Sequence, residues 1–184
     1  GNLHPAIPSF GNIDSSPTIP GLGFSLSTRG QMFYLDPKNP KAVQGGKRPT
    51  TTLTPSLVLK NGKPWAVFGT SGGDEQDQHT LQNFLNVVVF GMNVQEAIDF
   101  PKYDTQAIRS LFYPFRIGRR GKGPVMRVES RMPEETLKKL EAIGHPILKE
   151  GPWAFDLSHF LIIEDGMIYG GVSPRRETNY GIAW

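Results

Sequence analysis

Residues 56–74 read SLVLKNGKPWAVFGTSGGD, and they carry the clearest structural signal in the sequence. Two largely apolar runs, residues 56–60 and 63–68, flank the dipeptide Asn61-Gly62. An Asn-Gly pair supplies the two positive φ angles of a type I′ turn, and such turns join antiparallel strands. The stretch therefore predicts a β-hairpin whose second strand runs into a turn at residues 70–73.

Two helices are predicted after the hairpin. In the first, apolar residues recur at helical spacing until Gly91, and acidic residues stand where a helix N-terminus favours negative charge. The second begins at Asn93, which with Glu96 forms a capping-box pattern, and it is expected to end before Pro101. The apolar residues of the first helix are Leu81, Phe84, Leu85 and Val88, and the acidic ones are Asp74, Glu75 and Asp77.

The C-terminal half holds further elements with short connections. Residues 101–123 are aromatic and basic without a clear period, so they are predicted to be a loop. Hairpins rather than helical crossovers join the strands, which predicts an α+β domain with mainly antiparallel pairing. The expected elements are a strand at 125–129, a helix at 133–143 capped by Gly144, and strands at 158–163 and 167–172 joined by Glu164-Asp165-Gly166.

The composition allows one ordinary domain. The 184 residues are 38% hydrophobic and 20% charged, which suffices to bury one core. The 21 glycines and 16 prolines indicate many turns, above all in residues 1–50, which are predicted to be loops with one or two short strands. Long irregular segments of this kind are usually binding loops or lie against a partner.

Charge and hydropathy argue against several classes of protein. The net charge of +3 is small for a dedicated nucleic-acid binder, and the basic residues from Arg116 to Arg131 are interleaved with glutamate and apolar residues. We interpret that segment as a solvated loop rather than a nucleic-acid site. No run approaches the roughly 18 apolar residues that a membrane span needs, so no membrane span is expected.

Cysteine and histidine leave little support for metal chemistry. The chain has no cysteine, which excludes a cysteine nucleophile, thiolate zinc sites and a disulfide framework but leaves the compartment open. The four histidines show no spacing typical of metal ligands, so no metal site is expected. His79, on the first predicted helix, is interpreted as a surface or packing residue.

The turn at residues 70–73 could stabilise a negative oxygen. Gly72 and Gly73 lie between a buried strand and a helix start, where backbone N–H groups and the helix dipole both favour an anion. An oxyanion hole is built in this way. The same two glycines also fit an ordinary tight strand-to-helix turn, and spacing alone favours that simpler interpretation.

A hydroxyl cluster precedes the hairpin. Residues 50–54 read TTTLT, and Lys47 and Arg48 stand just before them. The hydroxyls could bind a polar ligand or cap turns at a strand edge, and the two cations could hold a carboxylate or remain solvated. Without other evidence, the hydroxyls are expected to cap turns or lie at a strand edge, and the two cations are expected to be solvated.

Six segments in one order resemble the small, C-terminal subunit of the γ-glutamyltranspeptidase family. They extend over nearly the whole chain, so together they are far more specific than any one of them. In this sequence they read GKRPTTTLTPSL (46–57), NGKP with FGTSGGD (61–64 and 68–74), NVQEAIDFP (93–101), EAIGH (141–145) and GGVSPRR (170–176).

The resemblance implies an N-terminal-nucleophile hydrolase with a four-layer αββα sandwich, made by autocleavage of a precursor. An N-terminal Thr would attack an amide, with its own α-amine as the base and no metal or organic cofactor. The large subunit, or the rest of the same precursor, would be the partner. By this resemblance Gly72 and Gly73 form the oxyanion hole, Thr51 and Thr52 match paired serines that hold the donor's carboxylate, and Arg48 stands in the neighbouring motif.

Two departures from the family pattern bear on substrate and activity. The family's acidic signature, whose Asp binds the donor's α-amino group, aligns with residues 28–35, where no carboxylate occurs before Asp36. The chain thus resembles divergent transpeptidase-like or cephalosporin-acylase-like members. The nucleophilic Thr would lie upstream of Gly1, so the chain is expected to be part of a small subunit. The alternative is a catalytically inactive relative that serves as a binding or structural subunit.

Overall fold

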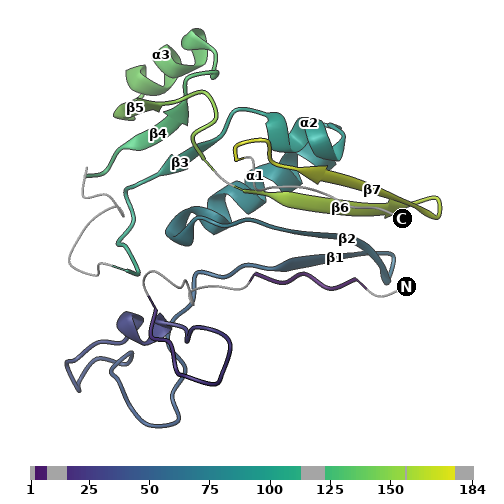
Figure 1. Cartoon of the computed structure of the whole chain (residues 1–184). Helices are drawn as coiled ribbons and strands as arrows, with labels where there is room; N and C mark the ends of the chain where they lie inside the picture. Colours follow the sequence, from purple (N-terminus) through teal and green to yellow (C-terminus); the bar gives the residue numbers. More distant parts are fainter. Residues whose placement is uncertain (1–2, 8–15, 113–122, 156, 177–184) are drawn as a thin grey trace.

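The computed structural model describes residues 3–7, 16–112, 123–155 and 157–176. These residues form a four-stranded sheet with two helices on one face, and a smaller three-stranded sheet beside it (Figure 1). Residues 113–122, which belong to the predicted loop and to the basic segment, lie outside the described residues. Among the helices of the described ranges, none is long and apolar enough to cross a membrane.

The four-stranded sheet is built from two hairpins. Its strands are β1 (Ser56–Lys60), β2 (Lys63–Gly69), β6 (His159–Glu164) and β7 (Met167–Val172). They lie in the order β1-β2-β6-β7, and every neighbouring pair is antiparallel. The φ angles are 54° and 75° at Asn61 and Gly62, and 51° and 77° at Asp165 and Gly166. Both connections therefore use two consecutive left-handed residues, and both predicted hairpins are confirmed.

Two helices, α1 (Gln76–Val88) and α2 (Val94–Asp99), cover one face of this sheet (Figure 1). The ring of Phe68 on β2 lies 4.4 Å from that of Phe160 on β6 and 5.6 Å from that of Phe84 on α1, measured between centroids. Side chains alternate along a strand, so Ala66 joins Phe68 on the covered face. The core cluster is completed by Val94, Ile98 and Ile162.

Helix α2 begins as the sequence predicts. The Asn93 side chain accepts hydrogen bonds from the backbone N–H groups of Gln95 and Glu96, and the Glu96 carboxylate accepts from the Asn93 N–H at 2.9 Å. This is a complete capping box. The helix ends at Asp99, before Pro101, also as predicted.

Helix α1 is confirmed as an element, but most of its apolar stripe faces outward. Leu81, Leu85 and Val88 are 54%, 37% and 44% exposed, while Phe84 packs against the core. The side chains that α1 buries are polar, so the helix depends on hydrogen bonds as well as on apolar packing. They are Gln76, His79, Thr80, Asn83 and Asn86.

The smaller sheet contains a parallel pair that the sequence did not predict. Its strands are β3 (Tyr103–Thr105), β4 (Met126–Glu129) and β5 (Ile147–Glu150), in that order. Strands β3 and β4 are antiparallel, whereas β4 and β5 are parallel and are connected through α3 (Glu134–Ala142). The predicted helix at 133–143 is confirmed, and Gly144 after it has φ 97°.

The loop prediction for residues 101–123 is wrong at β3. That strand has three residues, and its buried one is Asp104 rather than an apolar residue. It therefore lacks both the length and the apolar alternation that predict a strand. Strand β5 was missed for a related reason, because Ile147–Glu150 is short and only partly buried.

Glu129, at the end of β4, is the centre of a buried ion-pair cluster. Its carboxylate accepts hydrogen bonds from Arg175 Nε at 2.7 Å and Nη2 at 3.0 Å, and from Arg131 Nη2 at 2.7 Å. Burial acts to raise the pKa of Glu129, but Arg175, Lys102 and Arg131 outweigh burial and hold it below its ordinary value. Arg175 thus ties the end of β7 to the small sheet.

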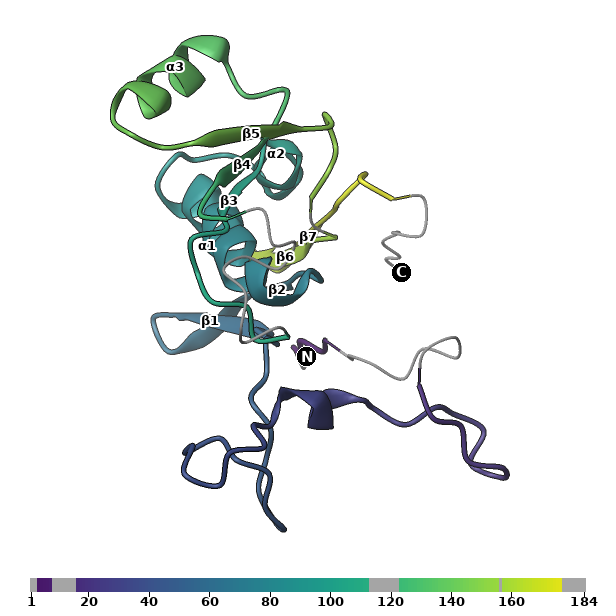
Figure 2. The same cartoon turned by 90° about the vertical axis from the view of Figure 1, so that its left-hand side faces the viewer.

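Residues 16–50 contain little regular structure, in agreement with the prediction of loops. Their described elements are the short 3-10 helix η1 (Arg29–Met32) and two isolated bridges, Thr18 with Ser25 and Tyr34 with Ala42. Figures 1 and 2 place this segment on the opposite side of the large sheet from α3. Its path returns to the sheet through residues 50–55, which lead into β1.

Candidate active site

The turn after β2 carries two consecutive glycines with positive φ. The angle is 133° at Gly72 and 75° at Gly73. A Cβ atom on Gly72 would meet no atom within 4 Å, so backbone conformation rather than lack of space requires glycine there. The 3-10 helix η2 (Gly73–Glu75) starts in the turn and leads into α1. A buried strand thus ends at a helical N-terminus, which is the arrangement that the sequence predicts.

Three consecutive side chains, those of residues 74–76, connect the turn to three other parts of the chain. The first is Asp74, which binds the segment after β3. Ser110 Oγ donates to Asp74 Oδ2 at 2.8 Å, and the Leu111 N–H donates to Asp74 Oδ1 at 3.2 Å. Ser110 is only 2% exposed, so this connection is shielded from water.

The second connection, through Glu75, joins the turn to the small sheet. Glu75 is 4% exposed, and its Oε1 accepts hydrogen bonds from Arg127 Nη2 at 3.0 Å and from Gln106 Nε2 at 3.3 Å. Arg127 also donates through Nε to Asp104 Oδ1 at 2.9 Å, and its Nη2 binds the other oxygen of Asp104. One buried guanidinium therefore bridges carboxylates from η2 and from β3.

Asp104 is held in its charged form within this cluster. Burial acts to raise its pKa, but the nearby His79 and the hydrogen bonds and charge of Arg127 outweigh burial, so the pKa lies below its ordinary value. His79 Nε2 lies 3.6 Å from Asp104 Oδ2, and the imidazole packs against Phe155 with 5.5 Å between ring centroids. His79 is 2% exposed and is a packing residue, one of the two roles expected for it.

The third connection, through Gln76, reaches the hydroxyl cluster. With its amide nitrogen turned toward two backbone carbonyls, Gln76 donates to Thr52 O at 3.0 Å and to Thr70 O at 3.1 Å. Thr70 is itself fixed, because its Oγ1 accepts from the Leu157 N–H at 3.1 Å. The residues before β1 and the end of β2 are thereby held side by side.

The predicted substrate-binding residues differ in position. Thr52 is 6% exposed and lies beside the turn, and its Oγ1 accepts a hydrogen bond from Arg29 Nη2 at 3.1 Å. Thr51 is exposed, and its Oγ1 accepts from the Leu53 N–H at 3.1 Å. Arg48 is exposed. The structure thus brings Thr52 to the Gly72-Gly73 turn, and the cation that contacts its hydroxyl is Arg29.

Sequence reasoning missed Arg29 as a site residue. It lies within residues 28–35, whose departure from the family pattern is a missing carboxylate, and no sequence pattern marks the cation. The role of Arg127 was also wrongly predicted. It falls in the basic segment interpreted as a solvated loop, yet it is 4% exposed and fully engaged with carboxylates.

A cavity of about 380 Å³ opens next to the turn. In the strand register, Gly69 pairs with His159 and Val67 with Leu161, and these residues point to the face of the sheet that α1 and α2 leave open. The cavity is lined by residues 4–7, by Val67, Phe68, Gly69, Thr70 and Ser71, and by Leu157, His159 and Leu161.

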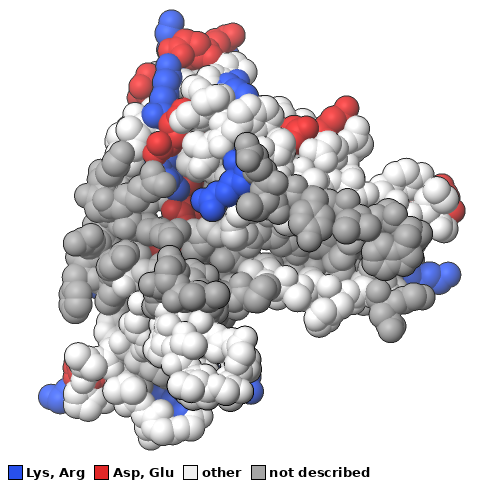
Figure 3. Space-filling model, in the orientation of Figure 1, with Lys and Arg blue, Asp and Glu red and all other residues white. Residues whose placement is uncertain are grey.

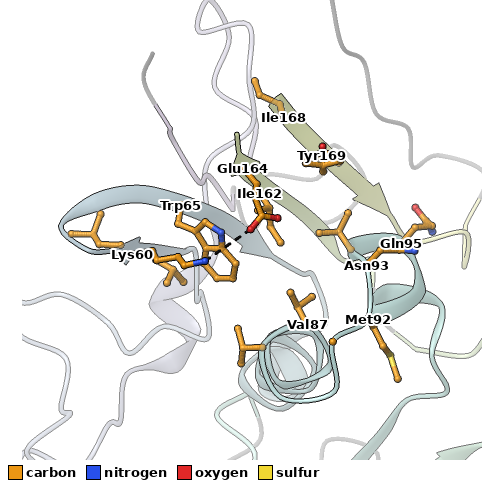
Figure 4. A pocket seen from close by; sticks show the side chains of 16 residues that line it. Lys60, Trp65, Val87, Met92, Asn93, Gln95, Ile162, Glu164, Ile168 and Tyr169 are labelled. Atoms are coloured by element: carbon orange, nitrogen blue, oxygen red, sulfur yellow. Dashed lines mark hydrogen bonds and ion pairs between the residues drawn. The ribbon is translucent and has the colours of Figure 1, made fainter. Parts of the chain in front are cut away.

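A larger groove of about 1100 Å³ lies at the other end of the large sheet (Figure 4). It is lined by Trp65 near the start of β2, by the end of α1 and by the hairpin of β6 and β7. Lys60 Nζ and Glu164 Oε1 stand 3.9 Å apart at its edge. Because β2 runs from this groove to the Gly72-Gly73 turn, the groove is separate from the candidate active site.

No metal site marks the described residues, and charges of both signs lie close together on one face of the molecule. Among residues 3–7, 16–112, 123–155 and 157–176, no group of three His, Asp or Glu side chains could hold a metal ion. On the face drawn in Figure 3, acidic and basic side chains are interspersed over the α3 end of the molecule. The site is therefore best described by its backbone turn, hydroxyls and arginine.

Known proteins resemble this chain over most of its length. The family model for gamma-glutamyltranspeptidase matches residues 8–183. The chain is 30% identical to the glutathione hydrolase-like YwrD proenzyme of Bacillus subtilis over 164 residues, which is 88% of this chain and 29% of that protein. It therefore spans less than a third of that relative.

Two solved structures share the fold. One, described as the structure of LmbA2991T421A, superposes with a TM-score of 0.80 at 38% identity and covers 91% of this chain and 29% of its own. The other, an acivicin-inhibited gamma-glutamyltranspeptidase, has a TM-score of 0.70 at 26% identity and covers 89% of this chain and 86% of its own. The helix-covered sheet is thus a portion of the N-terminal-nucleophile hydrolase fold, and the chain belongs to the γ-glutamyltranspeptidase family.

Proposed function

We propose that residues 1–184 act as the small-subunit domain of an enzyme that hydrolyses or transfers the acyl group of an amide. The observation that carries the proposal is the Gly72-Gly73 turn. Both residues have positive φ, the turn ends a buried strand, and residues 74–76 connect it to three other segments. A rigid pair of backbone N–H groups suits the stabilisation of a tetrahedral oxyanion.

The nucleophile in this proposal is the hydroxyl of an N-terminal Thr supplied by the preceding part of the precursor. Its oxygen attacks the amide carbon while its α-amine takes the hydroxyl proton, and the carbonyl oxygen becomes an oxyanion that accepts from the N–H groups of Gly72 and Gly73. The C–N bond then breaks and the proton leaves with the amine. Water or a second amine attacks the remaining ester and restores the Thr hydroxyl.

The donor pocket in this proposal contains Thr51 and Thr52, with Arg48 near its entrance. The backbone of Thr52 is joined to the turn through Gln76, so a donor held there would lie close to the oxyanion position. Thr51 and Arg48 are exposed, which suits contacts that form when substrate arrives.

The partner we infer is the rest of the same precursor. The face of the large sheet that the helices leave open carries Leu57 and Leu161, which are 44% and 40% exposed. The outer side of α1 adds Leu81 and Val88. Apolar rows on both sides of a sheet and helix layer support packing against further layers of the precursor.

The test uses the full-length protein after its processing has been verified by intact mass. γ-Glutamyl and glutaryl p-nitroanilides are the substrates, and release of p-nitroaniline is measured. We expect turnover of at least one, and a loss of up to about 10²- to 10³-fold in kcat for Gly73→Ala, because alanine disfavours φ 75° and would move the backbone N–H away from the oxyanion. No turnover by fully processed protein would instead favour the inactive binding or structural subunit.

A further inference from the structure

The side chain of Thr70, directly after β2, contacts the backbone of the oxyanion turn. Thr70 is 3% exposed. Its Oγ1 accepts a hydrogen bond from the Leu157 N–H at 3.1 Å and lies 3.0 Å from the carbonyl oxygen of Ser71. A hydroxyl carries one hydrogen and can accept as well as donate. Because the Leu157 nitrogen is the donor in the first bond, the Thr70 hydroxyl donates its own hydrogen to the Ser71 carbonyl.

This hydrogen bond determines where the N–H of Gly72 points. The Ser71 carbonyl and the Gly72 N–H belong to one peptide unit, which is trans like the other peptide bonds of the described residues. In a planar trans unit the C=O and the N–H point in opposite directions. The Thr70 hydroxyl, by holding the carbonyl, therefore directs the Gly72 N–H away from itself.

Gly72 on its own permits either orientation of this peptide unit. Reversing the unit would change the φ of Gly72 by about 180°, from 133° to about −47°. Glycine adopts positive and negative φ about equally readily, so it allows both conformations and selects neither. An interaction outside the glycine is needed to keep the N–H on one side of the turn.

The Thr70 hydroxyl is well placed to supply that interaction, because Thr70 is itself held on two sides. Its backbone carbonyl accepts from the Gln76 amide at 3.1 Å, and its Oγ1 accepts from the Leu157 N–H. Burial also limits competition by water for the hydroxyl, which strengthens a hydrogen bond relative to one in solvent. The hydroxyl is thus a fixed donor beneath the turn.

We propose that Thr70 is a positioning residue whose hydroxyl keeps the Ser71-Gly72 peptide unit in the orientation that presents the Gly72 N–H to the tetrahedral oxyanion. This inference rests on the proposed function. Without the hydroxyl, the unit would spend part of its time reversed, and the Ser71 carbonyl oxygen would then face the developing negative charge. A donor that stabilises the oxyanion would be exchanged for an acceptor that repels it.

The first test measures kcat and KM of the full-length, processed protein, using whichever of the γ-glutamyl and glutaryl p-nitroanilides is turned over faster. Thr70→Val keeps the shape of the side chain and removes the hydroxyl. We expect kcat to fall about 5- to 10-fold, the shift that one hydrogen bond produces in an equilibrium, while KM stays nearly constant. Thr70→Ser retains the hydroxyl and should keep most of kcat. An unchanged kcat in Thr70→Val would overturn the proposal.

Asn86→Leu is the control for the loss of a buried hydrogen bond. Asn86 is 7% exposed, and its Nδ2 donates to Ala97 O at 3.2 Å, near the end of α1 that lies away from the turn. We expect this variant to melt at a lower temperature but to keep its kcat. If its kcat fell as far as that of Thr70→Val, reduced stability would explain both losses and the role of Thr70 would be refuted.

Crystal structures of the processed protein and of Thr70→Val test the orientation of the peptide unit directly. We expect the Ser71 carbonyl to point toward Thr70 in the unsubstituted protein, and to be reversed or present in two orientations in Thr70→Val. The same single orientation in both proteins would overturn the role of Thr70, even if kcat fell. A reversed unit supports that role also where neither substrate is turned over, whereas absent turnover counts against the proposed function.

Discussion

The carboxylate of Glu75 lies 3.0 Å from the guanidinium of Arg127, with both side chains 5% exposed. This ion pair joins η2, beside the Gly72-Gly73 turn, to β4 of the small sheet. The two residues are far apart in sequence, so the pair forms only when both sheets are in place. It links the geometry of the candidate active site to the folding of a separate part of the chain.

Replacing Arg127 with Met should destabilise the protein by about 3–5 kcal/mol, because two buried carboxylates, Glu75 and Asp104, would lose their shared cation. Urea denaturation followed by circular dichroism measures this loss. Lys139→Met is the matched control. Lys139 and Glu135 form an exposed pair, for which we expect a change of less than about 1 kcal/mol. Equal effects of the two substitutions would contradict the importance of the buried pair.

Gly73→Ala and Gly62→Ala provide a matched test of the oxyanion role. Both glycines have φ 75°, so alanine is strained to a similar degree at either position, by about 1–3 kcal/mol. Gly62 lies in the β1-β2 hairpin turn, at the other end of β2. We expect both variants to melt at lower temperature but only Gly73→Ala to lose kcat. If Gly62→Ala lost as much kcat as Gly73→Ala, strain alone would explain the result.

The buried carboxylates of Asp104 and Glu129 predict that the folded protein loses stability in acid. The pKa values of Asp104 and Glu129 lie below their ordinary values, so each contributes stability above the unfolded-state pKa of about 4. That stability is lost as the pH falls through the folded-state pKa. Melting temperatures between pH 7 and pH 3, about the range in which carboxyl groups titrate, measure the effect.

Glu129→Gln and Glu134→Gln distinguish a buried carboxylate from an exposed one. The pKa of Glu134 is also lowered, through Lys149, but the pair is exposed and screened by solvent. We expect Glu129→Gln to lower the melting temperature at pH 7 and to flatten its pH dependence, while Glu134→Gln leaves both nearly unchanged. A Glu129→Gln protein as acid-sensitive as the unsubstituted one would contradict this assignment.

The face of the large sheet that α1 and α2 leave open is expected to be needed for assembly with the rest of the precursor. Leu161→Glu places a charge within the apolar row there, so we expect less processed, assembled protein from the full-length precursor. Size-exclusion chromatography and quantification of both processed chains provide the measurement. Ile143→Glu, at an exposed apolar residue after α3, serves as the control and should assemble normally. Normal assembly of Leu161→Glu would argue that this face is not an interface.

Sequence reasoning succeeded where the determining interactions are local. The Asn61-Gly62 turn and the Asn93-Glu96 capping box each depend on residues that are close in sequence, and both appear in the structure as expected. It failed where the partners are distant. Asp104 is polar and by itself predicts a loop, because its ion-pair partner Arg127 is distant in the sequence. The parallel pairing of β5 with β4 depends on a crossover connection rather than on a local turn.

The candidate site was predicted in part for the same reason. Gly72 and Gly73 stand out because their sequence context implies an unusual backbone. Arg29 does not, because a single arginine in an irregular segment has no local pattern that ties it to Thr52, 23 positions away. The outward stripe of α1 was likewise undetectable, since periodicity reveals an apolar face without revealing what covers it.

The side chains of residues 74–76 support the turn from three different directions. Successive residues in a 3-10 helix point about 120° apart, so neighbouring side chains at the end of η2 diverge toward different supports. Of these three residues, Gln76 is the one that contacts the backbone of Thr52. Of the three, Gln76 is therefore the residue that links the proposed donor pocket to the turn. In the proposed enzyme a substitution near Thr52 would reach the turn through Gln76, while Asp74 and Glu75 keep their own contacts with the segment after β3 and with the small sheet.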